Sequence, residues 1–323
     1  MTSARYVFIF IFLMSLTFLL LSNPVYSETD SKLIVFHAGS LAMPFKDISE
    51  GFSLENPGIR VLREAAGSRT CARKIVDLKR DCDVMASADY TVIEDLLFPD
   101  HADWNISFAT NEMAIMYRKN SRLSAQINSQ NWYKILLKDE VEYGHSDPNS
   151  DPCGYRSQLV WQLAEKYYKV PGLYNALREN CPPRNIRPKE TDLIAMLEAG
   201  QIDYLFIYRS VCEQHRMPFV PLPEEISLKS PAFRDFYKQA EIRITGKRPG
   251  EFLTKKGKPM VYGITIPKKA PYPEAALSFV AFVVGPSGQE IMRRNGQPPI
   301  SPPEATGKKE LLPSRLKSLV ICK

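Results

Sequence analysis

The segment LIVFHAGSLAMPF at residues 33–45 sets the architecture of the chain, because a glycine and a serine stand there between an apolar run and a helical one. Residues 33–37 are predicted to form a strand and residues 41–52 a helix. Three more stretches place polar residues just before a predicted helix: AGS at 66–68, DPCGY at 151–155 and KETD at 189–192. A helix start carries unpaired backbone N–H groups and the positive end of the helix dipole. These four stretches therefore predict a site for an anion.

The rest of the chain continues the alternation. Further strands are predicted at 59–63, 83–87, 141–144, 203–208 and 260–266, and helices at 71–80, 92–97, 158–168, 273–284 and 286–294. The apolar segment 111–117 is expected to carry the chain from one lobe to the next, and the proline-rich stretch 297–299 to form a surface loop. This order of elements predicts an α/β fold with largely parallel sheets.

The N-terminal 27 residues are typical of a signal peptide. Arg5 is the only charge before Glu28, an apolar run covers residues 6–21, and Ser27 is a small residue at the expected cleavage point. The alternative is a retained membrane anchor, although the run is shorter than the ~20 residues that span a bilayer. We expect cleavage and export, and no later segment is apolar enough to cross a membrane.

Charge and histidine content exclude several classes of function. The formal charge of +6, or +5 without Arg5, suits an anionic ligand. The densest basic run, KKGK at 255–258, is too short to indicate nucleic-acid binding. The four histidines include no H-E-x-x-H pattern, which argues against a metalloprotease.

The six cysteines all come after the predicted signal peptide, so disulfides are permitted in the exported protein. They are Cys71, Cys82, Cys153, Cys181, Cys212 and Cys322. None forms a C-x-x-C pair, so neither a zinc ribbon nor a thioredoxin-type motif is indicated. The sequence does not choose a pairing among them.

Six motifs together resemble the tungstate/molybdate solute-binding proteins of ABC importers, in particular their archaeal-type branch. They are HAGSL at 37–41, EAAGS at 64–68, DVMASADY at 83–90, DPCGYR at 151–156, KETD at 189–192 and DYLFIY at 203–208. The resemblance extends from residue 33 to about residue 300. It implies a type II periplasmic-binding-protein fold, in which two α/β lobes enclose a ligand cleft. Lobe 1 is expected to comprise residues 28–114 and 217–323, and lobe 2 residues 115–216.

The resemblance also implies a ligand site. In this family, serines and backbone amides hold the oxyanion, and two carboxylates bind the metal itself and raise its coordination from four to six. The matching residues here are Ser40, Ser68, Asp151, Glu190 and Tyr208, with Asp151 and Glu190 as the direct ligands of molybdenum or tungsten. This sequence departs from the archaeal pattern in one place. The stretch between the helix after DPCGY and the KETD motif is shorter here, at 181–184 (CPPR), and this bears on the position of Glu190.

Each of these residues also has a purely structural interpretation. Ser40 and Ser68 come after glycines, which allow close backbone approach to a ligand, but either serine could be a plain N-cap. Asp151 could be a turn or N-cap residue, and Glu190 a first-turn acid favoured by the helix dipole. Tyr208 could be a core tyrosine whose hydroxyl is bonded elsewhere.

Two carboxylates beside an anion need a chemical reason. At ~4 Å and an effective dielectric near 20, one carboxylate facing a dianion costs about 8 kcal/mol. The cost is offset only if the carboxylate oxygens bond to a Lewis-acidic centre. Tungsten(VI) and molybdenum(VI) can expand their coordination, whereas the sulfur of sulfate cannot. The pair therefore favours tungstate or molybdate and opposes sulfate.

Five residues near these motifs are expected to have structural roles. Arg69 and Arg156 are expected to pair with surface acids rather than with the ligand, and His37 to be a packed strand-end residue. A disulfide between Cys71 and Cys153, on opposite lobes, would hold the cleft shut, so both are expected to be free or only transiently paired.

These observations predict a monomeric periplasmic solute-binding protein that passes tungstate or molybdate to an ABC transporter permease and its ATPase. It is expected to be no enzyme, to carry no cofactor and to bind no nucleic acid. One alternative is another anion: sulfate, phosphate or an organic acid. A second is a hydrolytic enzyme with Asp151 and Glu190 as an acid–base pair, for which the sequence offers no clear nucleophile. The preference between tungstate and molybdate is left open.

Overall fold

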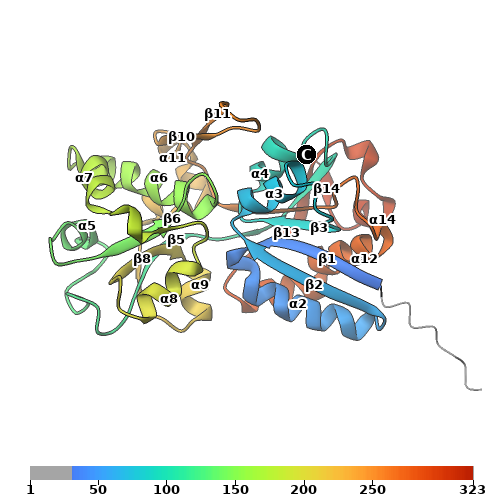
Figure 1. Cartoon of the computed structure of the whole chain (residues 1–323), viewed down its shortest axis with the longest axis horizontal. Coiled ribbons are helices and arrows are strands. Elements are labelled where there is room, and N and C mark those ends of the chain that lie inside the picture. The colour runs from blue at the N-terminus through green and yellow to red at the C-terminus, as the bar shows by residue number, and fades with distance from the viewer. Residues whose placement is uncertain (1–30, 323) are drawn as a thin grey trace, which may run out of the picture. The chain divides into compact units, whose positions relative to one another are not determined.

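The computed structural model describes residues 31–322, and the chain from Ser31 onward forms one compact unit. The predicted signal peptide lies outside the described residues. Two sheets organise this unit, and the β10–β11 hairpin (Glu241–Thr245 and Phe252–Lys256) forms a separate two-stranded ribbon (Figure 1).

The larger sheet has seven strands in the order β14-β13-β4-β12-β3-β1-β2. Their bounds are β1 Ser31–Ala38, β2 Ile59–Ala66, β3 Val84–Ser87, β4 Trp104–Thr110, β12 Val261–Thr265, β13 Pro299–Gly307 and β14 Ile321–Cys322. β1 pairs in parallel with β2 and β3, but β12 and β4 join antiparallel to their neighbours. The prediction of largely parallel sheets is therefore wrong. β12 comes after the chain has crossed to the smaller sheet and returned, and it runs opposite to its neighbours β3 and β4.

The smaller sheet has five strands in the order β7-β6-β8-β5-β9. Their bounds are β5 Met113–Tyr117, β6 Tyr143–Ser146, β7 Ile186–Arg187, β8 Tyr204–Tyr208 and β9 Phe219–Pro221. Here too β6 is parallel to both neighbours while β5 is antiparallel to β8 and β9. The chain passes from the large sheet to the small one between β4 and β5, within the segment predicted to do so. The lobe boundaries at 114 and 216 stay a prediction; β9 lies beyond the second of them.

Helices cover both faces of the larger sheet (Figure 1). They are η1 Gly39–Leu41, α2 Ala42–Glu55, α3 Ser68–Val76, α4 Tyr90–Leu97, α12 Pro273–Val284, α13 Pro286–Arg294, η4 Lys309–Leu311 and α14 Ser314–Lys317. Successive side chains of a strand point to opposite faces. Val35 of β1 accordingly joins the core that contains Phe45 and Phe279, while Phe36 joins the core of α3 and α4. The predicted bounds of α12 and α13 are confirmed.

The remaining helices accompany the smaller sheet and the return of the chain. They are α5 Trp132–Leu136, α6 Pro152–Tyr167, α7 Leu173–Asn180, η2 Pro183–Asn185, α8 Asp192–Glu198, α9 Arg209–Gln214, α10 Glu224–Ser227, η3 Pro231–Phe233 and α11 Arg234–Tyr237. α6 begins six residues before the predicted start at 158 and packs through the buried Trp161, whose ring lies 5.4 Å from that of Phe206.

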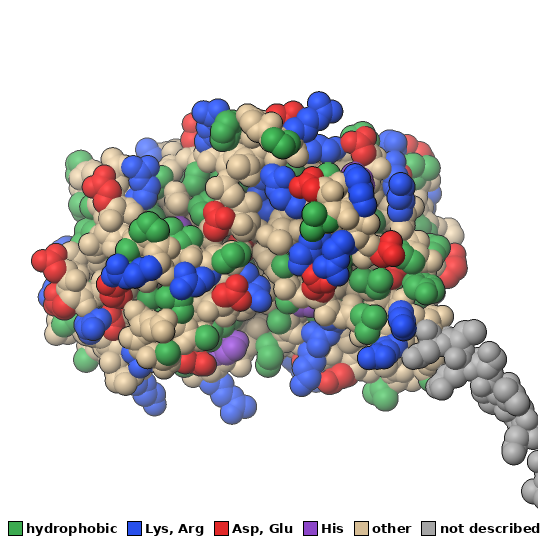
Figure 2. Space-filling view, in the orientation of Figure 1, with side chains coloured by type: hydrophobic (Ala, Val, Ile, Leu, Met, Phe, Trp, Pro, Cys, Tyr) green, Lys and Arg blue, Asp and Glu red, His purple; other side chains and the backbone are tan. Residues whose placement is uncertain are grey.

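The proline-rich stretch 297–299 is only in part a surface loop, since Pro298 alone of its three residues is exposed. Gln297 is fully buried, and β13 begins at Pro299 and pairs with β4. Among residues 31–322, no single helix is long and apolar enough to span a bilayer; α12 and α13 pass that test only together, across a 58° bend. On the face shown in Figure 2, Lys and Arg side chains are interspersed with Asp and Glu and form no continuous basic stripe.

Candidate functional site

Ser40 lies in η1, directly after β1. Its Oγ accepts a hydrogen bond of 3.0 Å from the Tyr262 hydroxyl, and Gln297 Nε2 donates to its carbonyl oxygen at 2.8 Å. The side chain caps neither η1 nor α2, so the N-cap interpretation is wrong for Ser40. A serine hydroxyl that accepts a hydrogen bond still has its own proton to donate.

Ser68 is the first residue of α3 and is fully buried. Its Oγ accepts a hydrogen bond of 3.0 Å from the backbone N–H of Ala88 and caps no helix, so the N-cap interpretation is wrong here as well. Gly67, just before it, lies against the loop that precedes α6: a Cβ on Gly67 would stand 2.4 Å from the carbonyl oxygen of Ser150. Only glycine permits this approach.

Asp151 is the N-cap residue of α6, as its structural interpretation predicts. Its Oδ1 accepts from the backbone N–H of Cys153 at 3.1 Å. Its Oδ2 accepts from the backbone N–H of Glu190 at 3.0 Å. The side chain therefore links the start of α6 to the KETD segment.

Glu190 precedes α8 instead of lying in its first turn. It is 1% exposed, yet among residues 31–322 neither of its carboxylate oxygens makes a hydrogen bond of normal geometry. Burial first, and the neighbouring Asp151 second, raise the pKa of Glu190 well above its usual range. A Cβ on Gly39 would lie 2.9 Å from Oε2, so the carboxyl group faces the turn that holds Ser40.

The short connection at 181–184 does not carry Glu190 away from Asp151. It leads through η2 into β7, which pairs in parallel with β6 at two positions, His145 with Ile186 and Ser146 with Arg187. The KETD segment comes directly after β7, and so it lies beside the loop between β6 and α6.

Tyr208 is the last residue of β8 and is fully buried. Its hydroxyl accepts a hydrogen bond of 3.0 Å from Arg156 Nη1, and its ring centre lies 6.4 Å from that of Tyr262, which donates to Ser40. Burial raises the pKa of Tyr208 well above its usual range. The hydroxyl therefore keeps a proton, which it can donate to a further acceptor.

Contacts connect the five predicted residues into one buried group. Asp151 bonds the backbone of Glu190, Glu190 faces the turn of Ser40, and Tyr262 lies between Ser40 and Tyr208. Ser68 joins through Ala88, whose carbonyl oxygen accepts from Arg156 Nη1 at 2.8 Å. Ser40 and Ser68 offer hydroxyl donors from the side of the larger sheet, and Asp151, Glu190 and Tyr208 offer carboxyl oxygens and one further hydroxyl from the side of the smaller sheet.

Sequence reasoning missed the residues that support Ser40. Asn111 Nδ2 donates to the Tyr262 hydroxyl at 2.9 Å and to Ser210 Oγ at 2.7 Å, and Gln297 reaches the Ser40 backbone. Asn111 lies at the crossing between the sheets, and Tyr262 and Gln297 lie more than 200 positions beyond Ser40. None of them belongs to a motif, so no local pattern points to them.

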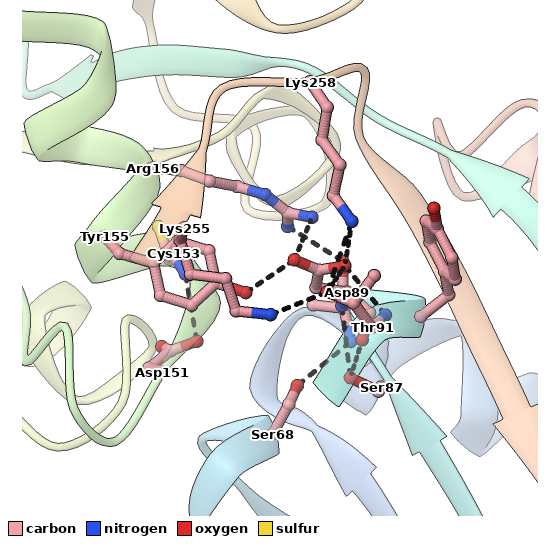
Figure 3. Close-up of polar contacts among 12 residues, drawn as sticks. Ser68, Ser87, Asp89, Thr91, Asp151, Cys153, Tyr155, Arg156, Lys255 and Lys258 are labelled. Carbon is pink, nitrogen blue, oxygen red and sulfur yellow. Dashed lines mark hydrogen bonds and ion pairs between the residues drawn. The ribbon is translucent and has the colours of Figure 1, made fainter. Parts of the chain in front are cut away.

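The expectation for the two arginines is wrong. Arg69 and Arg156 are both buried, and among residues 31–322 neither pairs with a surface acid. Arg69 Nε donates to the carbonyl oxygen of Asn149 at 2.9 Å, and its Nη2 donates to that of Thr245. Arg156 lies 3.8 Å from the buried carboxylate of Asp89 (Figure 3). Hydrophilic side chains can be buried when paired in this way, which a local sequence pattern does not reveal.

All six cysteines lie in the described part of the chain and are free thiols. Cys71 Sγ donates to the carbonyl oxygen of His37, and Cys153 Sγ to that of Phe206, each at 3.6 Å. Burial raises the pKa of Cys71 to about 12. His37 is buried near the end of β1 and packs 5.4 Å from the Phe45 ring, so its expected packing role is confirmed.

Within residues 31–322, no cluster of three or more His, Cys, Asp or Glu side chains could hold a metal ion. A site made of Asp151 and Glu190 thus has only two carboxyl ligands to offer. Two carboxyl ligands suit a metal centre that is already bonded to its other ligands when it enters the site.

Comparison with known proteins gives consistent results. The family model described as bacterial extracellular solute-binding protein matches residues 33–297. An uncharacterised solute-binding protein of Petrotoga mobilis is 60% identical over 86% of this chain and 86% of its own length. The molybdate/tungstate-binding protein WtpA of Thermococcus kodakarensis is 41% identical over 91% of this chain and 88% of its own length.

Among solved structures, the periplasmic molybdate-binding protein of Azotobacter vinelandii superimposes with a TM-score of 0.58 at 16% identity. The match covers 82% of this chain and 98% of that one. At this identity the likeness speaks for the fold alone, and it confirms the type II periplasmic-binding-protein fold.

Proposed function

We propose that this chain, which belongs to the family of bacterial extracellular solute-binding proteins, captures tungstate or molybdate and delivers it to an ABC transporter. Members of such a family bind solutes; they are not enzymes and carry no cofactor. The acid–base enzyme considered from the sequence is therefore set aside. The identity of the solute, the residues that bind it and the transporter are our proposal.

The observation that carries the proposal is the carboxyl group of Glu190. A buried acid normally finds a hydrogen-bond donor or a cation, because burying it alone is costly. Within residues 31–322, Glu190 has neither in normal hydrogen-bond geometry, and the groups that act on its carboxyl include Asp151 and the backbone of Ser40. Two adjacent carboxyl groups become favourable together when their oxygens bond a Lewis-acidic centre such as tungsten(VI) or molybdenum(VI).

The hydroxyl groups supply what the oxygens of an oxyanion need. Ser40, Ser68 and Tyr208 each accept a hydrogen bond from a neighbour, so each still has a proton to donate. Backbone N–H groups at the starts of η1 and α3 add further donors. In our proposal these groups hold the oxygens, while Asp151 and Glu190 bind the metal and complete six-fold coordination.

The relatives support this assignment. The 41% identical Thermococcus protein is called a molybdate/tungstate-binding protein, and the match spans most of both chains. A family of extracellular proteins fits export to the periplasm, where we propose that the protein works as a monomer. From there it would present its ligand to a membrane permease with an attached ATPase.

Isothermal titration calorimetry of residues 28–323 against tungstate, molybdate and sulfate tests the proposal directly. We expect tight one-to-one binding of the first two anions and no measurable heat with sulfate, because the two carboxyl groups repel an anion whose centre they cannot bind. Tungsten or molybdenum X-ray absorption on the complex should show six light-atom neighbours.

Equal affinity for sulfate, or a four-coordinate metal in the complex, would contradict the proposed coordination. Binding of phosphate or of an organic acid in place of tungstate would keep the solute-binding role and change the ligand.

A further inference from the structure

Asp89 is a buried acid outside the group of proposed ligands, at the point where three segments of the chain meet. It comes just after β3, is 1% exposed and caps α4. Its Oδ1 accepts from the backbone N–H and from the hydroxyl of Thr91, both at 3.0 Å, and lies 3.3 Å from Lys258 Nζ (Figure 3). This oxygen is thus held by Thr91, at the start of α4, and by Lys258, in the connection between β11 and β12.

The other oxygen, Oδ2, faces α6, which packs on the smaller sheet. The Tyr155 hydroxyl donates to it at 2.7 Å, and Arg156 Nη2 lies 3.8 Å away. Oδ2 therefore joins Asp89, which follows β3 of the larger sheet, to α6 across the cleft. Lys258, Lys255 and Arg156 hold the pKa of Asp89 far below its usual range, so the group is charged.

Arg156 is the counterpart of Asp89 on α6, and its side chain is 3% exposed. Its Nη1 donates both to the carbonyl oxygen of Ala88 and to the hydroxyl of Tyr208. The N–H of the same Ala88 donates to Ser68. One guanidinium group thus contacts the acid across the cleft, the proposed ligand Tyr208, and Ala88, which bonds the proposed ligand Ser68.

We propose that Asp89 and Arg156 form a catch across the cleft that holds the closed state and turns the Tyr208 hydroxyl toward the ligand. Both are positioning residues; neither contacts the metal. The assignment of Tyr208 as a donor rests on the proposed function, whereas the catch itself rests only on contacts within the chain.

Each group of the catch keeps some partners and loses others when the two sides separate. Asp89 retains Thr91 on Oδ1, because Thr91 belongs to the helix that Asp89 caps, but Oδ2 loses Tyr155 and Arg156. Both freed groups then gain water, which offsets much of the lost attraction. The closed state is therefore only modestly favoured, and a ligand that contacts both sides shifts the equilibrium toward it. Without the catch, a bound ligand should escape faster, since the contact exists only in the closed state.

Asp89→Asn is the sharpest variant. The amide oxygen can still accept from Thr91 and cap α4, while an uncharged NH₂ replaces the Oδ2 that receives Tyr155 and Arg156. Glu64→Gln is the matched control, because Glu64 also pairs with two cations, Lys74 and Arg80, but does so within one side of the cleft. Tyr155→Phe removes a single hydrogen bond from Oδ2 and should give an intermediate effect.

Spin labels on the two sides report closure with or without a ligand. Leu54→Cys and Asn175→Cys place labels on the exposed surfaces of α2 and α7, in a Cys322→Ser background that removes the exposed native thiol. Pulsed electron–electron distance measurements are made on the free protein and with tungstate. Stopped-flow measurement gives the tungstate dissociation rate.

We expect Asp89→Asn to reduce the short-distance population in both conditions and to raise the dissociation rate roughly ten- to a hundredfold. Glu64→Gln should match the parent in every measurement. If tungstate shortens the distance equally in the parent and in Asp89→Asn, with unchanged dissociation, the catch is wrong while the proposed ligand stands. If Asp89→Asn lengthens the distance but tungstate has no effect on any variant, the catch stands and the proposed ligand is wrong. A parent protein with no short-distance population in either condition overturns the catch.

Discussion

β1 of the larger sheet and β6 of the smaller sheet each carry a buried histidine one residue before the strand end, and each strand leads into the site. His37 Nδ1 lies 2.8 Å from the carbonyl oxygen of the next residue, Ala38. His145 Nδ1 lies 2.7 Å from that of Ser146. Each ring also packs on an aromatic side chain, Phe45 in one case and Trp161 in the other. The two sides of the cleft are built on the same local plan.

The residues beyond the two strand ends differ in their chemistry. After β1 comes Ser40, a hydroxyl with a proton to donate, and after β6 comes Asp151, whose oxygens accept. We propose that the hydroxyl groups on the β1 side can bind any oxyanion, whereas the carboxyl groups on the β6 side, which also carries the Tyr208 hydroxyl, accept only an anion whose centre takes oxygen ligands. In our proposal, the β1 side thus supplies general oxyanion affinity and the β6 side supplies selectivity.

The largest expected effect on tungstate affinity comes from removing a carboxylate on the β6 side of the cleft, to which we assign selectivity. Glu190→Gln keeps the shape of the side chain but has only a weak neutral oxygen for the metal, so we expect tungstate affinity to fall roughly a hundredfold or more. Calorimetry measures it. Glu198→Gln, at the exposed end of α8, is the control and should bind as the parent does. Unchanged tungstate binding by Glu190→Gln would show that Glu190 does not bind the metal. The proposed difference in selectivity between the β1 and β6 sides would then be wrong.

The second largest effect on tungstate binding is expected from a glycine that lies close to the opposite side of the cleft. Gly67 and Gly39 both do so, but their replacement should have different costs. A Cβ on Gly67 meets backbone, the Ser150 carbonyl oxygen at 2.4 Å, whereas a Cβ on Gly39 meets the flexible end of Glu190 at 2.9 Å. Gly67→Ala must hold the two sides apart, and we expect a loss of about 1–3 kcal/mol of tungstate binding, roughly ten- to a hundredfold. Gly39→Ala should cost less. Small-angle scattering should show no contraction with tungstate for Gly67→Ala; the reverse ranking would mean that closure does not bring these segments together.

Removing a hydroxyl from the general side should have a smaller effect. Ser40→Ala or Ser68→Ala deletes one donor while the backbone N–H groups remain, so we expect about 0.5–1.5 kcal/mol, or a several-fold weaker Kd, for tungstate and molybdate alike. Calorimetry with both anions checks it. A loss as large as that of Glu190→Gln would show that affinity is not divided between the sides as proposed.

The smallest expected difference is between the two histidines themselves. Burial lowers the pKa of His37 and of His145 to about 4, from the ordinary 6.5. Between these values the unfolded chain binds protons that the folded protein does not, so the free energy of unfolding falls as the pH is lowered. Each histidine contributes about 1.4 kcal/mol per pH unit in that window and nothing above it.

Denaturant unfolding of ligand-free His37→Gln and His145→Gln, at pH 7 and pH 5, measures these two slopes. Each variant should lose the same share of the pH dependence of the parent protein. Unequal losses would show that the two strand ends are not equivalent environments.

The sequence predicted those parts of the fold that depend on local chemistry. α12 and α13 were predicted to the residue because each begins at a proline in its first turn, and Gly285 and Asn295-Gly296 stand just past their ends. β13 was missed because prolines at 302 and 303 argue against a strand. In the structure they fall where the register of β13 against β4 shifts, between Pro299 and Glu304.

The residues of the candidate site also fall into two groups: those that a local motif marks and those that only the folded chain brings together. The family resemblance points to its five residues because each lies in a short motif beside a helix start or a strand end, and their roles as ligands stay a prediction. The partners that orient them could not. Asn111, Tyr262 and Gln297 reach the site through sheet order and crossing strands, and no spacing within the chain encodes those contacts.

The order of strands in the larger sheet also bears on how the chain folds. β4 has β12 and β13 as its neighbours, and β12 alone joins β4 to β3. The first four strands therefore cannot form one sheet until residues beyond 260 are present, whereas the smaller sheet uses only residues 113–221. Closing so long a loop is slow compared with local pairing. The larger sheet, which contains the N-terminal strands, is therefore completed last, at a time when the smaller sheet can already be folded.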